Sequence, residues 1–323
     1  MFQASTVSSI DCKIREGSFQ WRLGQKPAFP IVPGGDFVGI VTSCGSNAEA
    51  NGILPGDRVA SFLYHGCNAK YRVTNYNGLV KVPKEVSPFE AVALIRTYTA
   101  AFQALMQGIS GHGRYSRKPL LDKRVLIVGP CGTFERALVE LSTLLGAKKV
   151  YFSAHSSNHS HDMYIRLLGA KPLPEDPEEW IDEVEGRIDI AVDSICIDRY
   201  EYSYSALHED GILVAAGMMD IEKTDDLISN IEKIWTHTTL AINNHCTYYH
   251  GFVSEWGSNR KQCMKDMIYL FNMLDNGKIK PKIATKIPMT KVAAAQERLD
   301  QNLESMERRG IIVVDPWLLP VME

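Results

Sequence analysis

Residues 1–95 alternate short apolar runs with turn residues. Gly, Pro and Asn separate these runs so closely that strands joined by tight turns are expected rather than helices. The pattern therefore predicts a compact β-rich domain over residues 1–95. Its strand-like runs are "FPIVPGGDFVGIVTSCGS", "GDRVASFLY", "AKYRVT" and "GLVKVP", and another strand-like stretch begins almost at the first residue.

A long helix is expected next. The stretch "SPFEAVALIRTYTAAFQALMQGI" has helical periodicity, with Ser87 as N-cap and Pro88 at the first helical position. The polar and basic segment that follows, "SGHGRYSRKPLLDKR", is expected to be a solvated loop.

From Val125 onwards the chain alternates between strand and helix patterns. Such alternation predicts a parallel sheet with helices on both faces, which makes residues 96–255 a doubly wound α/β domain. The predicted strands are "RVLIV", "KVYFSA", "DIAVDS", "GILVAAG" and "TTLAIN". Residues 256–323 then predict a helix ending at Gly277, a strand "PKIATKIPM", a helix "TKVAAAQERLDQNL" and a final strand "GIIVVD".

Composition narrows the class of protein. The 323 residues suffice for two domains, and 45% apolar content allows ordinary buried cores. A formal charge of −3 gives no reason to expect nucleic acid or a membrane surface as partner, so we expect a small-molecule substrate. Seven cysteines without a Cys-x-x-Cys pair fit reduced thiols in a cytoplasmic protein. No apolar run reaches ~18 residues, and the first ten residues lack a secretory signal.

The clearest chemical signal is the stretch "VLIVGPCGTFERALVELSTLLGA". Gly129 and Gly132 form a G-x-x-G turn between a strand and a helix, where N–H groups and the helix dipole suit a pyrophosphate. The alternative is an ordinary strand–helix turn. Pro130 removes one backbone donor from the turn. Glu135 stands where a third glycine would let the helix pack closely on the strand, and its carboxylate is expected near the phosphates. We therefore expect the turn to bind a dinucleotide only weakly.

The residues at the end of the next predicted strand, "KVYFSA", indicate which nicotinamide cofactor the protein prefers. The segment "SAHSSNH" at residues 153–159 has no Asp or Glu to bind a ribose 2′-hydroxyl, but it offers hydroxyls and imidazoles. This favours NADPH over NADH. Alternatively, the serines only cap the following helix.

The chain as a whole resembles the medium-chain dehydrogenase/reductase superfamily, and within it the zinc-free quinone oxidoreductase and enoyl reductase branch. The resemblance covers nearly the full length, and the order of the motifs makes it specific. It is carried by "STVSSIDCKIREG", "FPIVPGGDFVGIVTSCGSN", "LPGDRVASF", "EAVALIRTYTAAFQAL" with its Thr-Ala pair, "IDIAVDSI", "EDGILVAAGMM", "DNGKIKPKI" and "RRGIIVV".

The resemblance implies a Rossmann domain and a GroES-like β-rich catalytic domain built from both chain ends. It also implies that this domain is N-terminally shortened, that NADPH binds in a cleft between the domains, and that hydride passes to an activated C=C bond or a quinone. By matching position, Gly129, Gly132, Thr133 and Phe134 would hold the pyrophosphate, Ser153, His155 and Ser156 the 2′-phosphate, and Thr99, Asp193 and Ser194 the nicotinamide. From their residue type, Tyr64 and Tyr98 are candidate proton donors, and Tyr248 and Tyr249 are further candidates. The alternative for each of them is a packed aromatic side chain.

Zinc is not expected. The zinc-dependent members carry a Gly-His-Glu segment, which here reads Gly34, Gly35, Asp36, and Ser8 and Ser9 stand where they have a ligand cysteine. Catalytic zinc needs three protein ligands, so we predict no bound metal. The spacing of His155, His159 and His161 could suggest a metal site, but an adenosine rim or solvent is the expected surrounding.

A rival function remains open. The shortened N-terminus and Glu135 favour a catalytically impaired family member that acts as a cofactor-sensing or interaction protein. The Thr-Ala pair, the hydroxyl-rich segment and the strand order favour the enzyme. Whether the protein forms a homodimer also stays open.

Overall fold

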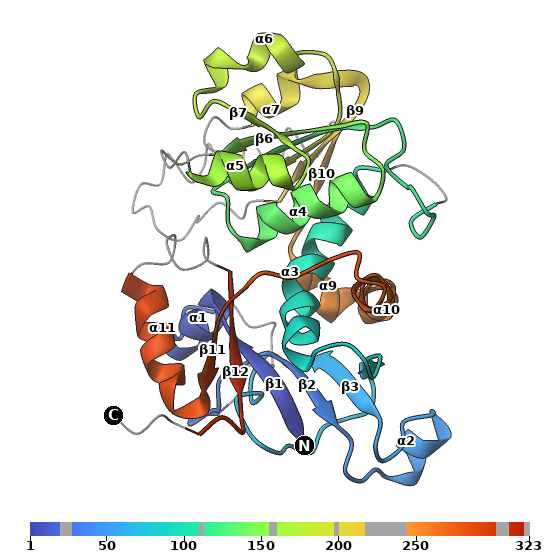
Figure 1. The fold of residues 1–323 in the computed structure, drawn as a ribbon, viewed down its shortest axis with the longest axis vertical. Helices are drawn as coiled ribbons and strands as arrows, with labels where there is room; N and C mark the ends of the chain where they lie inside the picture. The colour runs from blue at the N-terminus through green and yellow to red at the C-terminus, as the bar shows by residue number, and fades with distance from the viewer. Residues whose placement is uncertain are drawn as a thin grey trace. The chain divides into compact units, whose positions relative to one another are not determined.

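The computed structural model describes residues 1–19, 28–109, 113–154, 160–196, 200–216, 244–301 and 310–319. The chain divides into two compact units (Figure 1). One unit comprises Met1–Thr99 and Glu255–Glu323, and the other comprises Ala100–Ser254. Two helices cross the boundary in sequence: α3 (Pro88–Gln107) and α9 (Phe252–Ser258).

The first unit is built on a sheet to which both ends of the chain contribute. Its described strands follow the order β11-β12-β1-β2-β3-β4. Strand β1 runs antiparallel to β2 and β12, with Ser5 opposite Val314, whereas β11 and β12 are parallel. The strands are β1 (Phe2–Val7), β2 (Asp36–Ile40), β3 (Arg58–Phe62), β4 (Val80–Lys81), β11 (Ile283–Pro288) and β12 (Ile311–Asp315).

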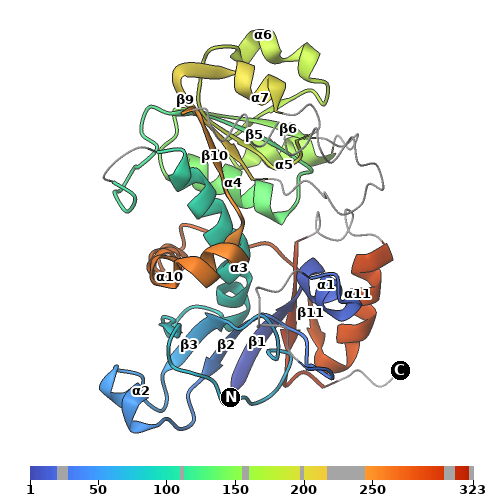
Figure 2. The same ribbon diagram turned by 180° about the vertical axis from the view of Figure 1, so that it is seen from behind.

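Helices from both ends of the sequence also meet in this unit. Helix α1 lies beside α11, which Figures 1 and 2 show from opposite sides. Cys12 of α1 packs with Val292 and Leu299 of α11, so the two ends share one apolar cluster. The helices of this unit are α1 (Ser9–Glu16), α2 (Ser46–Ala50), α10 (Arg260–Asp275) and α11 (Val292–Gln301), with a 3₁₀ turn at Met289–Lys291.

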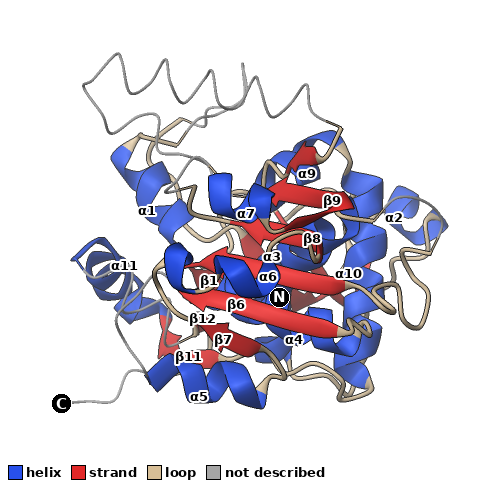
Figure 3. Ribbon diagram, turned by 90° about the horizontal axis from the view of Figure 1, so that it is seen from above, coloured by secondary structure: helices blue, strands red, loops and turns tan. Residues whose placement is uncertain are grey.

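The second unit contains a parallel sheet with the strand order β10-β9-β8-β5-β6-β7. The chain leaves β5 for β6 on one side and later returns to β8 on the other, so the order reverses between β5 and β8. Figure 3 shows β9, β8, β6 and β7 following one another across this sheet. That is the strand order of a Rossmann sheet, in which ligands bind at the carboxyl ends beside the reversal. The strands are β5 (Arg124–Gly129), β6 (Lys149–Ala154), β7 (Lys171–Leu173), β8 (Ile188–Asp193), β9 (Leu207–Ala215) and β10 (Cys246–Tyr248).

Helices alternate with these strands, as the sequence predicts. They are α4 (Thr133–Leu144), α5 (Ser160–Leu167), α6 (Ile181–Val184) and α7 (Glu201–Ser205), with a 3₁₀ turn at Pro177–Glu179. The strands at the centre of the sheet have apolar cores: Leu126, Ala191 and Leu213 are completely buried. Parallel strands that are covered on both faces have this composition. The predicted mixed α/β fold is confirmed.

Some local expectations were wrong. The run "AKYRVT" forms no strand, and its Tyr71 and Val73 side chains are exposed, so the alternation there does not reflect a buried face. The short strand β7 was not predicted, and the predicted strand "TTLAIN" lies outside the described residues. Among the described residues, no helix is both long enough and apolar enough to cross a lipid bilayer.

Candidate functional site

The glycine-containing turn follows β5, at the reversal of the parallel strand order. Gly129 ends the strand, and α4 begins at Thr133. Cys131, between the glycines, is completely buried and has a φ of 61°, in the left-handed region that non-glycine residues rarely adopt. Such conformations persist where the surrounding structure fixes them, and they concentrate at functional sites.

Glu135 points back into this turn. Its side chain is buried, and its Oε2 accepts a hydrogen bond from the Gly132 N–H at 2.8 Å. Its Oε1 accepts a second bond from the Ser194 hydroxyl at 2.7 Å. Ser194 directly follows β8, so the carboxylate connects the ends of the two strands at the reversal.

The electrostatic surroundings of Glu135 act in two directions. Burial raises the pKa of the Glu135 carboxyl, while the bonds from Ser194 and the backbone N–H groups, together with Arg136, favour the ionised form. Perturbed carboxyl groups of this kind occur more often at functional sites than elsewhere. Glu135 is therefore the chemically distinctive residue of the turn.

The glycines of the turn make room for Glu135. A Cβ atom at Gly129 would lie 2.4 Å from Cγ of Glu135 and 2.6 Å from Oγ of Ser194. One at Gly132 would lie 3.0 Å from Oε2 of Glu135. The Glu135 side chain therefore packs directly against both glycines of the turn, where any larger residue would overlap it.

The other sequence-predicted residues of this unit have different partners. Thr133 and Phe134 are half-buried in the first turn of α4, where N–H groups have no acceptor within the helix. The Ser153 hydroxyl donates to the Pro174 carbonyl oxygen at 3.1 Å. His155 and Ser156, predicted for the 2′-phosphate, lie outside the described residues, as does His159, and the side chain of His161 is not described.

Asp193 organises the chain after β8. It is buried, and its Oδ1 accepts hydrogen bonds from the N–H groups of Ile195 and Cys196 at 2.9 and 3.0 Å. Its Oδ2 accepts a bond from the Ser203 hydroxyl at 2.7 Å. These bonds fix the loop that presents Ser194 to Glu135, so Asp193 supports the turn through its neighbour.

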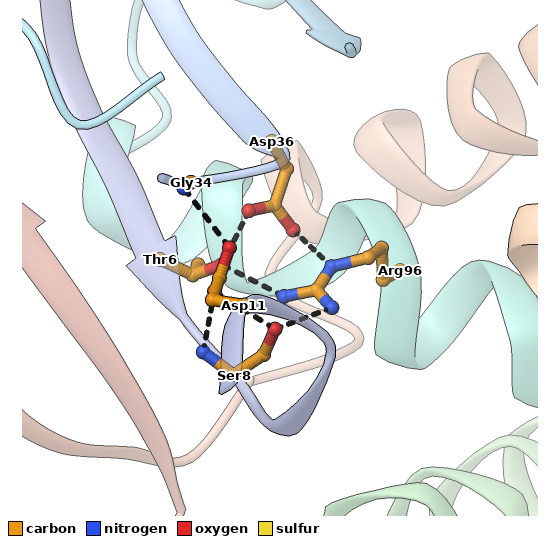
Figure 4. A network of polar contacts seen from close by, with 6 residues as sticks. All are labelled: Thr6, Ser8, Asp11, Gly34, Asp36 and Arg96. Carbon is orange, nitrogen blue, oxygen red and sulfur yellow. Dashed lines mark hydrogen bonds and ion pairs between the residues drawn. The ribbon is translucent and has the colours of Figure 1, made fainter. Parts of the chain in front are cut away.

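The first unit contains a second polar cluster, drawn in Figure 4. Arg96, on α3, donates from Nε to Asp36 at 2.7 Å, from Nη1 to the Ser8 hydroxyl at 2.9 Å and from Nη2 to the Thr6 hydroxyl at 2.9 Å. The Thr6 hydroxyl in turn donates to Asp36. One guanidinium therefore joins β1, the start of α1, β2 and α3.

Asp11 completes the cluster. Its Oδ1 accepts a bond from the Gly34 N–H at 2.9 Å, and its Oδ2 accepts the N–H and the hydroxyl of Ser8 at 2.8 and 3.0 Å. Ser8 is the N-cap of α1, so this pair is a capping box with aspartate as the third residue. Burial raises the pKa of Asp11, Arg96 opposes that shift, and Asp36 adds to it.

This cluster contains Ser8 and Asp36, which lie in the two segments that the sequence resemblance matches to the zinc ligands of the zinc-dependent members. Here a guanidinium already neutralises Asp36 and occupies the Ser8 hydroxyl. In the part of the chain that the structure describes, no group of three His, Cys, Asp or Glu side chains is arranged to hold a metal ion. Arg96 was not predicted as a site residue, although an arginine inside the apolar pattern of a helix signals a buried partner.

Three further candidates lie in the first unit. Thr99 is completely buried, and its Oγ1 has no hydrogen-bond partner among the described residues. Tyr98 is buried as well, while Tyr64 is half-buried, has a φ of 68° and packs edge-on against Phe62 with ring centroids 4.9 Å apart. Of the other two tyrosines, Tyr249 belongs to the second unit and donates to Gln103 at 2.9 Å.

Known proteins resemble the chain in sequence. Residues 1–84 match the alcohol dehydrogenase GroES-like domain. The chain is 34% identical to the chloroplast envelope quinone oxidoreductase homolog of Arabidopsis thaliana, over 97% of this chain and 88% of that protein. It is 35% identical to the chloroplastic quinone-oxidoreductase homolog of Spinacia oleracea, but that match spans only 44% of this chain and 42% of the relative.

Solved structures share the fold. A 2-haloacrylate reductase superposes with a TM-score of 0.72 at 21% identity, covering 98% of this chain and 90% of that one. The quinone oxidoreductase of Thermus thermophilus, solved also in complex with NADPH, gives a TM-score of 0.66 at 19% identity, covering 97% and 89%.

A GroES-like domain and a Rossmann sheet within one chain define an oxidoreductase of the alcohol dehydrogenase type. The chain belongs to the medium-chain dehydrogenase/reductase superfamily and is quinone oxidoreductase-like.

Proposed function

We propose that the protein is a zinc-independent, NADPH-dependent oxidoreductase that reduces a quinone or an activated C=C bond of a small molecule. The observation that carries this proposal is the strand–turn–helix unit of β5 and α4 at the reversal of the sheet, in a chain 34% identical to a quinone oxidoreductase homolog over 97% of its length. In such proteins the cofactor supplies the hydride, and the protein supplies position and electrostatics.

The preference for NADPH rests on the residues after β6. No carboxylate stands at residues 153–159 to bind the ribose 2′-hydroxyl of NADH, and hydroxyl and imidazole side chains stand there instead. The Thermus thermophilus relative was solved with NADPH, which supports the same choice here.

The absence of zinc chemistry is proposed on a different ground. The guanidinium of Arg96 already provides a positive charge beside Asp36 and Ser8. A metal cation bound at these residues would be repelled by that charge. We infer that substrate polarisation in this protein falls to hydrogen-bond donors rather than to a Lewis acid.

A non-catalytic role in cofactor sensing or protein interaction is the second candidate. One observation favours it: the carboxylate of Glu135 fills the turn in which the pyrophosphate would bind. In that case the fold persists while dinucleotide binding is lost.

Titration with both nicotinamide cofactors separates the two functions. The whole chain is titrated with NADPH and with NADH by fluorescence, and NADPH oxidation is then followed with a set of quinones and enones. We expect NADPH to bind at least about tenfold more tightly than NADH, a difference of ~1.4 kcal/mol. Equal or tighter binding of NADH would contradict the cofactor assignment. Binding of neither would favour the non-catalytic role.

A further inference from the structure

We propose that the Glu135 carboxylate is an internal competitor for the phosphate position of the turn, and that a dinucleotide must displace it in order to bind. This inference rests on the proposed function, because it concerns how the same turn accepts NADPH. In this proposal Glu135, in the first turn of α4, sets the affinity of the protein for NADPH.

The hydrogen bonds of Glu135 give the first argument. An anion at the start of a helix accepts bonds from the exposed N–H groups and interacts favourably with the helix dipole. The Glu135 carboxylate already accepts the Gly132 N–H at 2.8 Å and the Ser194 hydroxyl at 2.7 Å. Pro130 cannot donate, so the turn has one donor fewer to offer to a second anion.

The shape of the turn gives the second argument. Gly129 and Gly132 leave the space that close approach of a phosphate requires, and atoms of Glu135 fill it to within 2.4 and 3.0 Å of the missing Cβ positions. The side chain and a pyrophosphate therefore compete for the same volume. Both are anionic, and two anions in one desolvated turn repel each other strongly.

Displacement would release two donors together. If Glu135 rotates away, the Gly132 N–H becomes available, and so does the Ser194 hydroxyl, whose other contact is the Val128 carbonyl oxygen at 3.2 Å. These two groups belong to two of the segments that the family resemblance assigns to the cofactor. Arg136, the next residue of α4, favours the ionised form of the carboxylate. In this proposal, the arrangement with Glu135 in the turn and the arrangement with Glu135 displaced differ in the position of that one side chain.

The test compares NADPH affinity among three variants of the whole chain. Glu135→Ala empties the turn, and Glu135→Gln keeps the side-chain volume and an oxygen that can accept the Gly132 N–H. Glu140→Ala is the matched control, because it removes the same charge from the same helix five residues further on. Far-UV circular dichroism and thermal melting establish that each variant is folded.

We expect Glu135→Ala to tighten NADPH binding about tenfold, Glu135→Gln to tighten it clearly less, and Glu140→Ala to leave it unchanged. Adenosine 2′-monophosphate, which lacks a pyrophosphate, is expected to bind wild type and Glu135→Ala equally. Binding by Glu135→Ala when wild type does not bind also supports the proposal.

Two outcomes overturn it in different ways. Equal NADPH affinity in wild type and Glu135→Ala refutes the competitor while the proposed function stands. Failure of every folded variant to bind NADPH or NADH refutes both. If Glu135→Gln gains as much as Glu135→Ala, charge repulsion alone accounts for the affinity, and the requirement that the side chain be displaced is refuted.

Discussion

Arg96 shows how much of the first unit depends on one side chain. Its guanidinium contacts Thr6, Ser8 and Asp36, which come from β1, the start of α1 and β2. Only 15% of the Arg96 side chain and 2% of the Asp36 side chain are exposed. A pair buried to this degree is costly to break from one side, because the remaining charge has no compensation.

Arg96→Met is therefore expected to lower the free energy of unfolding by ~3–5 kcal/mol. Urea unfolding followed by circular dichroism measures the change. The control is Lys81→Met, which breaks the pair of Lys81 with Asp57, where the side chains are 54% and 24% exposed. An exposed pair contributes only ~0–1 kcal/mol, so this control should change stability little. Similar losses in both variants would contradict the argument.

At the same scale, the sequence identifies the residues of the turn but not their partners. Glu135 stands out as a departure from the glycine pattern, and its carboxylate is expected near the phosphates. Its bond to Ser194 could not be predicted, because those residues meet only through the pairing of β5 with β8. Arg96 and Asp36 likewise lie far apart in sequence, and no local pattern connects them.

At the scale of elements, the packing of α4 against the end of β5 depends on the contact between Gly129 and Glu135. The strand end can approach the first turn of the helix only because Gly129 has no Cβ. Residue choice on the two elements is thus coupled: the glycine of one accommodates the long side chain of the other.

Gly129→Ala is expected to destabilise the protein by ~1–3 kcal/mol, because its Cβ would overlap Glu135 and crowd Ser194. Gly132→Ala should cost less, since its Cβ would meet only the far end of the Glu135 side chain. Thermal unfolding of these variants and of the Gly129→Ala/Glu135→Ala double variant measures the coupling. We expect the double variant to lose less free energy of unfolding than the two single variants lose together. Strict additivity would show that the two residues do not interlock.

Elements with strong periodicity are predictable, and short ones are not. Helix α3 and strands β5, β6 and β8 follow the predicted runs closely, because a long apolar pattern outweighs local ambiguity. Helix α1 was not predicted, although its Ser8 and Asp11 form a capping box three residues apart. The run "AKYRVT" misled because alternation indicates a strand only when one face is buried, and Val73 is 97% exposed.

At the scale of the whole molecule, the resemblance places this chain in a superfamily with zinc-dependent and zinc-free branches. The positions that the resemblance assigns to the zinc ligands belong to the Arg96 cluster, whose members form hydrogen bonds with one another. We therefore propose that the first unit is stable without a bound metal ion.

The purified protein is accordingly expected to contain no stoichiometric zinc, and chelators should change neither NADPH binding nor any reductase activity. Elemental analysis of the whole chain, before and after dialysis against a chelator, provides the measurement. One zinc per chain would contradict the prediction and would direct attention to His155, His159 and His161.

The pairing of β1 with β12 also sets an order of events during synthesis. Strand β1 is made before the second unit, and its neighbour β12 is made after it, because the second unit lies wholly between them. Domains fold as units while the chain emerges, and pairings of distant segments form slowly. The second unit can therefore fold while one edge of β1 is still unpaired. An unpaired strand edge favours aggregation, so we expect the first unit to be the part of the nascent chain most prone to it.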